Sequence, residues 1–158
     1  MAPAPLRSTG EDLSCYTCDQ EVALATAPPR ERIAYDGHWR VAHVITSSLP
    51  GWLVLIPRRH VVTVAELTDG EAASLGTWQV RVSRALHEVV GCEKTYVAQF
   101  AEAAGFGHVH FHLIPRMPGW AAGERGPQVF RRLGVAAADH VPEAEMDRLS
   151  SRLAAALV

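Results

Sequence analysis

Residues 105–115 read GFGHVHFHLIP, a segment in which histidine and an apolar residue alternate three times. In a β-strand, successive side chains point to opposite faces of the sheet. A strand here would carry three histidines on one face, which are His108, His110 and His112. The other face would carry three apolar residues, which are Val109, Phe111 and Leu113. We therefore predict a strand over residues 108–115 whose apolar face packs on a helix and whose imidazoles face solvent or a cleft.

Geometry limits what the three histidines can do together. Residues two apart on a strand are separated by roughly 6.6 Å, and residues four apart by about 13 Å. Two adjacent imidazoles can converge on one zinc ion, whereas all three cannot do so unless the strand bends. The row is consistent with two kinds of site: a set of metal ligands, or a nucleophile with phosphate-binding neighbours.

A Cys-x2-Cys pair near the start of the sequence adds a second group of candidate ligands. The thiolates of Cys15 and Cys18, together with the imidazoles of two histidines, can complete a closed tetrahedral zinc site; the histidines are His60 and His108. A redox pair and two unrelated buried thiols are the alternatives, although no βαβ pattern of the kind that carries redox pairs surrounds the motif. Cys92 makes the cysteine count odd, which argues against a disulfide framework.

Two segments resemble the signatures of the histidine-triad (HIT) family. Residues 108–114 match its alternation of histidine and apolar residues, and residues 52–60, WLVLIPRRH, resemble its apolar strand that ends in proline, two basic residues and histidine. The resemblance runs from about Cys15 to Pro115. It implies an α+β domain with a five-stranded antiparallel sheet and a long helix, usually paired as a symmetric homodimer through that helix and a strand.

The resemblance also implies a role for each site residue. In zinc-containing members, the positions that match Cys15, Cys18, His60 and His108 bind the metal. The position of His110 is the nucleophile, which forms a covalent nucleotidyl-histidine that water then hydrolyses. The position of His112 binds and neutralises the phosphate. A backbone carbonyl beside His108 is expected to hold the second nitrogen of His110. We expect Gln99 and the backbone N–H groups around Gly105 and Gly107 to be further phosphate donors.

The chain departs from the family pattern at three places. Many members carry an Asn in the strand before the triad, a role for which Gln99 is the candidate here. Many members carry Gly-Gln-Ser before the triad, where this chain has Ala103-Ala104-Gly105 and no hydroxyl. An acidic residue that grips the ribose in many members falls close to Val44. These departures leave the nucleoside specificity open and affect the phosphoryl chemistry less.

The resemblance leads us to expect a HIT-type hydrolase of a small nucleotide. It would cleave a phosphoanhydride, phosphoester or phosphoramidate bond in a dinucleoside polyphosphate, a nucleoside phosphoramidate or an adenylylated metabolite. One alternative is a hydrolase in which His108 and His110 hold a metal that activates water. The other is a zinc-stabilised nucleotide-binding protein without turnover.

Local signals predict most of the secondary structure. The dipeptide Asp36-Gly37 indicates a hairpin between strands 33–35 and 39–44, and further strands are expected over residues 52–56 and 95–100. Thr68 and Glu71 are spaced as a capping box that starts a helix, and Gly91 is placed to end it. A last helix should open at Pro142.

The remaining segments complete the expected organisation. Residues 1–12 are interpreted as a flexible tail and residues 13–158 as a single domain. Residues 115–134 are interpreted as a long loop in which Trp120 is a candidate to close over a base.

Composition and charge exclude several classes of partner. Of the 158 residues, 48% are hydrophobic and 20% charged, and the net charge of −2 gives no basis for binding nucleic acid or an acidic membrane. No apolar run approaches the length of a membrane span, and residues 1–13 lack the apolar core of a signal peptide. We therefore expect a cytoplasmic protein.

Overall fold

One antiparallel sheet forms the centre of the molecule. The computed structural model describes residues 14–158, so the predicted tail over residues 1–12 lies outside the described residues. The five strands occur in the order β1-β2-β3-β5-β4. They are β1 (Ala34–Tyr35), β2 (Trp39–His43), β3 (Leu53–Pro57), β4 (Lys94–Gln99) and β5 (Phe111–Arg116). With the α-helices α1 (Tyr16–Val22), α2 (Asp69–Val90) and α3 (Glu143–Ala156), they confirm the expected α+β class.

The long helix α2 begins and ends at the predicted residues. The Thr68 hydroxyl accepts a hydrogen bond from Glu71 N, and the Glu71 carboxylate accepts one from Thr68 N at 2.7 Å. Gly91 follows the helix in the left-handed conformation, with φ of 74°, which glycine adopts without steric cost. The helix therefore has its capping box and its glycine stop, as the sequence predicts.

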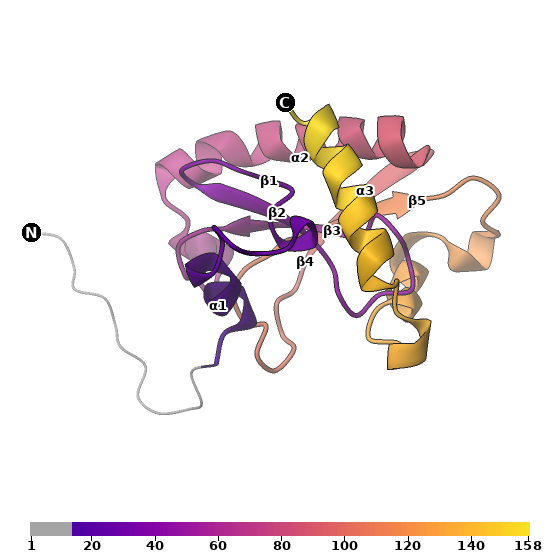
Figure 1. Ribbon diagram of the computed structural model, residues 1–158, viewed down its shortest axis with the longest axis horizontal. Helices are drawn as coiled ribbons and strands as arrows, with labels where there is room; N and C mark the ends of the chain where they lie inside the picture. Colours follow the sequence, from indigo (N-terminus) through magenta and orange to yellow (C-terminus); the bar gives the residue numbers. More distant parts are fainter. Residues whose placement is uncertain (1–13) are drawn as a thin grey trace, which may run out of the picture.

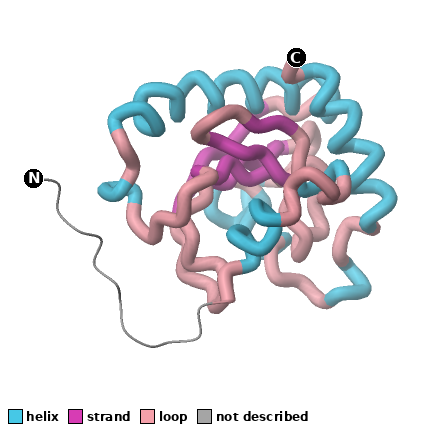
Figure 2. Tube along the Cα trace, turned by 60° about the vertical axis from the view of Figure 1, so that its left-hand side comes forward, coloured by secondary structure: helices cyan, strands magenta, loops and turns pink. Residues whose placement is uncertain are grey.

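The main core lies between the sheet and the helices α2 and α3, which pack on one face (Figure 1). It contains the apolar residues of the triad segment, which are Val109, Phe111 and Leu113. Figure 2 shows the strands enclosed by helices and loops, with the long helix running across them. The prediction that the apolar face of the triad segment packs on a helix is confirmed.

The opposite face of the sheet carries His112 and two further apolar clusters. Ala42, Val54 and Ile56 form a buried apolar cluster there, and Trp52, Ile114 and Val129 belong to a second one. Short 3-10 helices, η3 (Ala122–Glu124), η4 (Gly126–Arg132) and η5 (Ala137–Asp139), lie in the long segment between β5 and α3. The predicted loop over residues 115–134 therefore contains two of these short helices, η3 and η4.

The triad segment enters the sheet later than predicted. β5 begins at Phe111, because its ladder with β3 runs only from Leu53↔Leu113 to Leu55↔Phe111. Upstream, Val109 N donates to Val61 O at 2.8 Å, and Val61 lies beyond the end of β3. The predicted strand over residues 108–115 was therefore wrong at residues 108–110, which turn out of the sheet.

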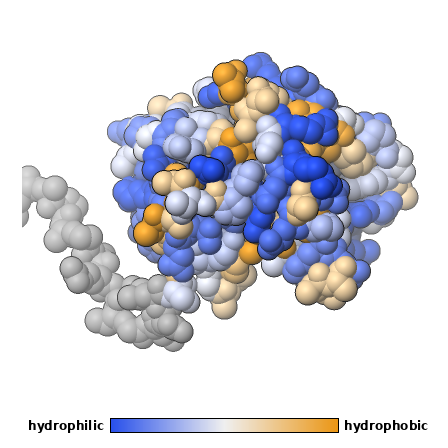
Figure 3. All heavy atoms as spheres, in the orientation of Figure 1, coloured by the Kyte–Doolittle hydropathy of each residue, from blue (hydrophilic) through white to orange (hydrophobic). Residues whose placement is uncertain are grey.

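Hydrophobic residues are scattered among hydrophilic ones on the face shown in Figure 3. Across residues 14–158, no helix combines the length and the apolar composition that a membrane span needs.

Candidate functional site

A cavity of about 740 Å³ lies over the face of the sheet that carries the histidines. Its floor is apolar and includes Ala42, Val54 and Ile56. His110 and His112 lie in its wall, and a second polar group, made by Tyr16, Thr17, Glu31 and Arg40, lines it as well. Its volume is in the range of pockets that bind small molecules.

His110 is held in one tautomer by the backbone. Its Nδ1 lies 2.8 Å from the carbonyl oxygen of His108. Because a carbonyl only accepts hydrogen bonds, Nδ1 carries the proton and Nε2 carries the lone pair. Burial lowers the pKa of His110, so the ring is neutral at pH 7. The carbonyl that the family resemblance implied is thus present, and the ring can act as a nucleophile through Nε2.

His112 has a different partner. The indole Nε1–H of Trp52 donates to its Nδ1 at 3.0 Å. The ring of His112 also lies 5.5 Å from that of Phe130 and 4.8 Å from that of His110, both edge to face. Burial lowers the pKa of His112 to about 4. A neutral His112 can donate a hydrogen bond to a phosphate, but it does not supply the positive charge implied by the resemblance.

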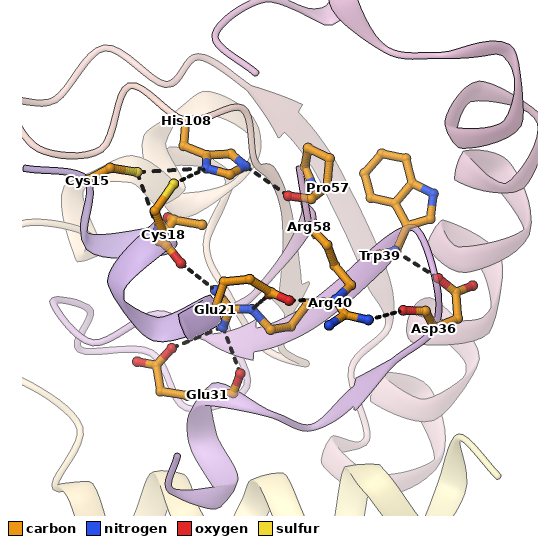
Figure 4. Close-up of polar contacts among 11 residues, drawn as sticks. Cys15, Cys18, Glu21, Glu31, Asp36, Trp39, Arg40, Pro57, Arg58 and His108 are labelled. Carbon is orange, nitrogen blue, oxygen red and sulfur yellow. Dashed lines mark hydrogen bonds and ion pairs between the residues drawn. The ribbon is translucent and has the colours of Figure 1, made fainter. Parts of the chain in front are cut away.

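The four predicted metal ligands come together around one point. The donor atoms of Cys15, Cys18, His60 and His108 all lie within 4.8 Å of one another. Figure 4 shows both cysteine sulfurs beside the His108 ring, whose other nitrogen points toward Pro57. The Nε2–H of His108 donates to Pro57 O at 2.8 Å, which leaves Nδ1 free to bind a metal.

The distances in this cluster fit a tetrahedral metal ion. Cys18 Sγ lies 3.2 Å from His60 Nδ1 and 3.6 Å from His108 Nδ1, and Cys15 Sγ lies 3.7 Å from the latter. Zinc–ligand bonds of about 2.3 Å to sulfur and 2.0–2.1 Å to nitrogen place tetrahedral donors roughly 3.5 Å apart. Burial and the neighbouring Cys15 raise the pKa of the Cys18 thiol to about 12, so a bound cation has to displace that proton.

A buried ionic network adjoins the metal cluster (Figure 4). The guanidinium of Arg40, on β2, lies 3.2 Å from the carboxylate of Glu21 and 3.3 Å from that of Glu31. Arg40 also donates to the backbone oxygen of Thr17 at 3.3 Å, and the Tyr16 hydroxyl donates to Glu31. The network therefore attaches α1 to the sheet through contacts that do not involve the metal ligands.

Three predicted phosphate-binding positions lie outside the cavity wall. Gln99 pairs with Phe111 in the β4–β5 ladder, so its side chain lies on the α2 face and not on the face of His112. Gly105 contacts the start of α1, because its carbonyl accepts a hydrogen bond from Tyr16 N at 3.2 Å. The cavity is lined instead by residues 100–104 and Phe106, so neither Gly105 nor Gly107 is brought into it.

Two further sequence-based expectations have different outcomes. Val44 lines the cavity at the position where many family members carry an acid. Trp120, the candidate to close over a base, packs under the guanidinium of Arg132 at 4.5 Å and is not a lining residue. Phe130, from the same segment, takes a place in the wall. The sequence assigned no individual site role to Trp52, Phe130 or Arg40. Trp52 and Val54 are two apart in the predicted strand and so share a face, which is the one signal that could have placed Trp52 beside the site.

A family model for the HIT domain matches residues 26–119, more than half of the chain. The chain belongs to the HIT family. This family comprises nucleotide-binding proteins, hydrolases and transferases, and it also includes non-catalytic members. Among curated protein sequences, none matches this chain.

Solved structures share the HIT fold with this chain. A Zn-bound histidine triad family protein from Mycobacterium smegmatis has 22% sequence identity and a TM-score of 0.64, over 90% of this chain and 94% of that one. A histidine triad protein from Bradyrhizobium japonicum has 28% identity and the same TM-score of 0.64, over 80% and 90%. The NitFhit protein of C. elegans has 21% identity and a TM-score of 0.55, over 78% of this chain and 27% of that longer one.

Proposed function

We propose that this HIT protein is a hydrolase that cleaves a phosphate bond of a small nucleotide through a covalent intermediate on His110. The observation that carries the proposal is the hydrogen bond of 2.8 Å between His110 Nδ1 and His108 O in the wall of the cavity. It leaves Nε2 of the neutral ring as the attacking atom, because this nitrogen carries the lone pair. Attack on phosphorus forms an N–P bond and expels the leaving group with its electron pair, and water then releases the nucleotide.

The second ring supports the same chemistry. His112 lies beside His110, with ring centroids 4.8 Å apart, and it lines the same cavity. A donor fixed next to the nucleophile stabilises charge that develops on the phosphoryl oxygens. The substrates that fit this proposal are dinucleoside polyphosphates, nucleoside phosphoramidates and adenylylated metabolites.

We propose zinc as the metal of the Cys/His cluster, with a structural role. Two thiolates and two imidazoles are a ligand set that zinc prefers, and the M. smegmatis protein of the same fold is Zn-bound. When bound, the ion would tie α1 to the end of β3 and to the triad segment, in contact with all four protein donors. Because these four donors complete a tetrahedral site, the arrangement gives little support to a metal that activates water between His108 and His110.

We also propose that the protein acts as a homodimer. β4 is an edge strand, and its Val97 is 47% exposed. A groove beside it is lined by Val97 and by residues of α2 that include Val80, Arg84 and Glu88. A surface that carries both an arginine and a glutamate can complement itself across a two-fold axis. A second copy of this chain is therefore the partner we assign to this face.

Intact-protein mass spectrometry tests the catalytic proposal. The wild type, quenched briefly without acid after mixing with a panel of adenylylated and guanylylated compounds, should gain the mass of one nucleotide. His110→Ala removes the attacking nitrogen, so it should show no adduct and a turnover lower by at least about 10³-fold.

His38→Ala is the matched control, because His38 is an exposed histidine on the hairpin before β2 and does not line the cavity. This variant should keep both adduct and turnover. Undiminished turnover in His110→Ala would refute the proposal. Tight binding of nucleotides without adduct or product would instead identify a nucleotide-binding protein.

A further inference from the structure

His110 and His112 are neighbouring imidazoles whose Nδ1 atoms face partners of opposite kind. His110 Nδ1 meets a carbonyl oxygen, that of His108, at 2.8 Å. His112 Nδ1 meets the indole nitrogen of Trp52 at 3.0 Å. A carbonyl only accepts hydrogen bonds and an indole N–H only donates them. The two partners therefore require opposite tautomers of the two rings.

We propose that Trp52 is a positioning residue that fixes His112 in its Nε2–H tautomer, so that His112 donates a hydrogen bond to the phosphoryl group that His110 attacks. With Nδ1 accepting from the indole, the single proton of a neutral His112 sits on Nε2. His110 has its proton on Nδ1 and its lone pair on Nε2. Among the described residues neither Nε2 has a hydrogen-bond partner, and both rings line the cavity. The catalytic role of this tautomer rests on the proposed function, whereas the tautomer itself follows from the hydrogen bond to Trp52.

The fold holds the indole in place for this task. Trp52 directly precedes β3, two residues before Val54, which is the cross-strand partner of His112. Side chains two apart on a strand share a face, so Trp52 lies diagonally across from His112, within reach of a large aromatic side chain. Its side chain is fully buried, and the ring of Phe130 packs edge to face against both Trp52 at 5.4 Å and His112 at 5.5 Å. The indole therefore has little freedom to turn its N–H away.

The alternative tautomer would work against catalysis. If His112 carried its proton on Nδ1, its Nε2 lone pair would face the phosphoryl oxygens, and an acceptor would oppose an acceptor. It would also leave two N–H groups pointing at each other, one from Trp52 and one from His112. Because burial keeps the pKa of His112 low, at about 4, a second proton does not resolve the conflict near pH 7. The indole thus converts two similar imidazoles into one nucleophile and one donor.

Nitrogen-15 NMR of histidine-labelled protein tests the assignment without a substrate. In the wild type, the two-bond correlations of His112 should identify the Nε2–H tautomer and those of His110 the Nδ1–H tautomer. Trp52→Phe keeps an aromatic ring but removes the N–H, so His112 should then populate both tautomers. Trp120→Phe, outside the cavity wall, is the matched control and should leave the His112 signals unchanged. An Nδ1–H tautomer for His112 in the wild type would overturn the proposal, as would an unchanged tautomer in folded Trp52→Phe.

Kinetics on whichever compound forms the adduct extend the test. Trp52→Phe should lower kcat by about tenfold, the scale of one net hydrogen bond, with a smaller change in KM. In a His112→Ala background, Trp52→Phe should have no further effect, whereas an equal loss in both backgrounds would show a merely structural role and overturn the proposal. If no compound is turned over, the proposed function fails while the NMR result still decides the tautomer.

Discussion

His43 shows at the scale of one residue how burial fixes a protonation state. It lies on β2 with both ring nitrogens bonded: Gly51 N donates to Nε2 at 2.9 Å, and Nδ1–H donates to Val44 O at 2.8 Å. Burial lowers its pKa to about 4. A histidine whose pKa is depressed in the folded state stabilises the fold above its unfolded pKa of about 6.5, and this stability is lost as the pH falls toward 4.

We therefore predict an acid-labile fold in which His43 contributes about 3 kcal/mol of the loss between pH 6.5 and pH 4. His43→Gln can keep both hydrogen bonds but does not titrate. Urea unfolding at several pH values should give a shallower loss of stability for this variant than for the wild type. His38→Gln, an exposed substitution on the neighbouring hairpin, is the control and should keep the wild-type slope. Equal slopes for the wild type and His43→Gln would contradict the prediction.

Single residues also show how far the site could be predicted from the sequence. The alternation around His110 and the spacing of Cys15 and Cys18 are local signals, and they led to the rings and thiols that the structure brings together. Gln99 was chosen for its chemistry, but the register of β4 against β5 turns it to the other face. Phe130 carries no local signal, because its place in the cavity depends on the path of the chain after β5.

Helices and strands also differ in whether local sequence or distant contacts determine them. The helix α2 and the hairpin at Asp36 were predicted because a few adjacent residues determine a cap or a turn. The helix α1 has only seven residues and was not predicted. Its position depends on distant partners, above all Arg40 and the metal cluster. β5 begins late for a related reason, since His108 and Val109 bond to Pro57 and Val61, about fifty residues away in sequence.

Metal removal should act on α1 more than on the rest of the fold. The cluster joins Cys15 and Cys18, at the start of α1, to His60 and His108, whereas Arg40 holds the same helix through Glu21 and Glu31. A chelator should therefore lower Tm by roughly 10 °C without unfolding the protein at room temperature. Hydrogen exchange should increase in α1 and in residues 105–110, and remain slow in α2.

The double variant Cys15→Ser, Cys18→Ser is the control for this effect. It lacks both thiolates, so the chelator should leave its Tm unchanged, and the metal content measured by mass spectrometry should be close to zero. A chelator effect of equal size in the double variant would show that the stabilising metal binds elsewhere.

At the scale of the whole molecule, the decisive surface is the edge of the sheet. β4 ends the order β1-β2-β3-β5-β4, and an exposed edge strand is a template for pairing with another chain. Beside it, Val80 of α2 is 48% exposed and Val97 of β4 is 47% exposed. Pairing two copies through this edge would extend the sheet, cover both valines and bring α2 against its copy.

Val80→Glu and Val97→Glu should therefore each convert the proposed dimer to a monomer. In a two-fold interface each substitution occurs twice, so two carboxylates would be desolvated in the same interface. The affinity of the dimer should therefore fall by at least roughly 100-fold. Light scattering coupled to size-exclusion chromatography measures the mass directly. Val64→Glu is the matched control, because Val64 is 46% exposed but lies on the 3-10 helix Val64–Glu66 outside this groove. A wild type that is monomeric at micromolar concentration would refute the proposed dimer, and a dimer that survives both groove substitutions would show that its interface lies elsewhere.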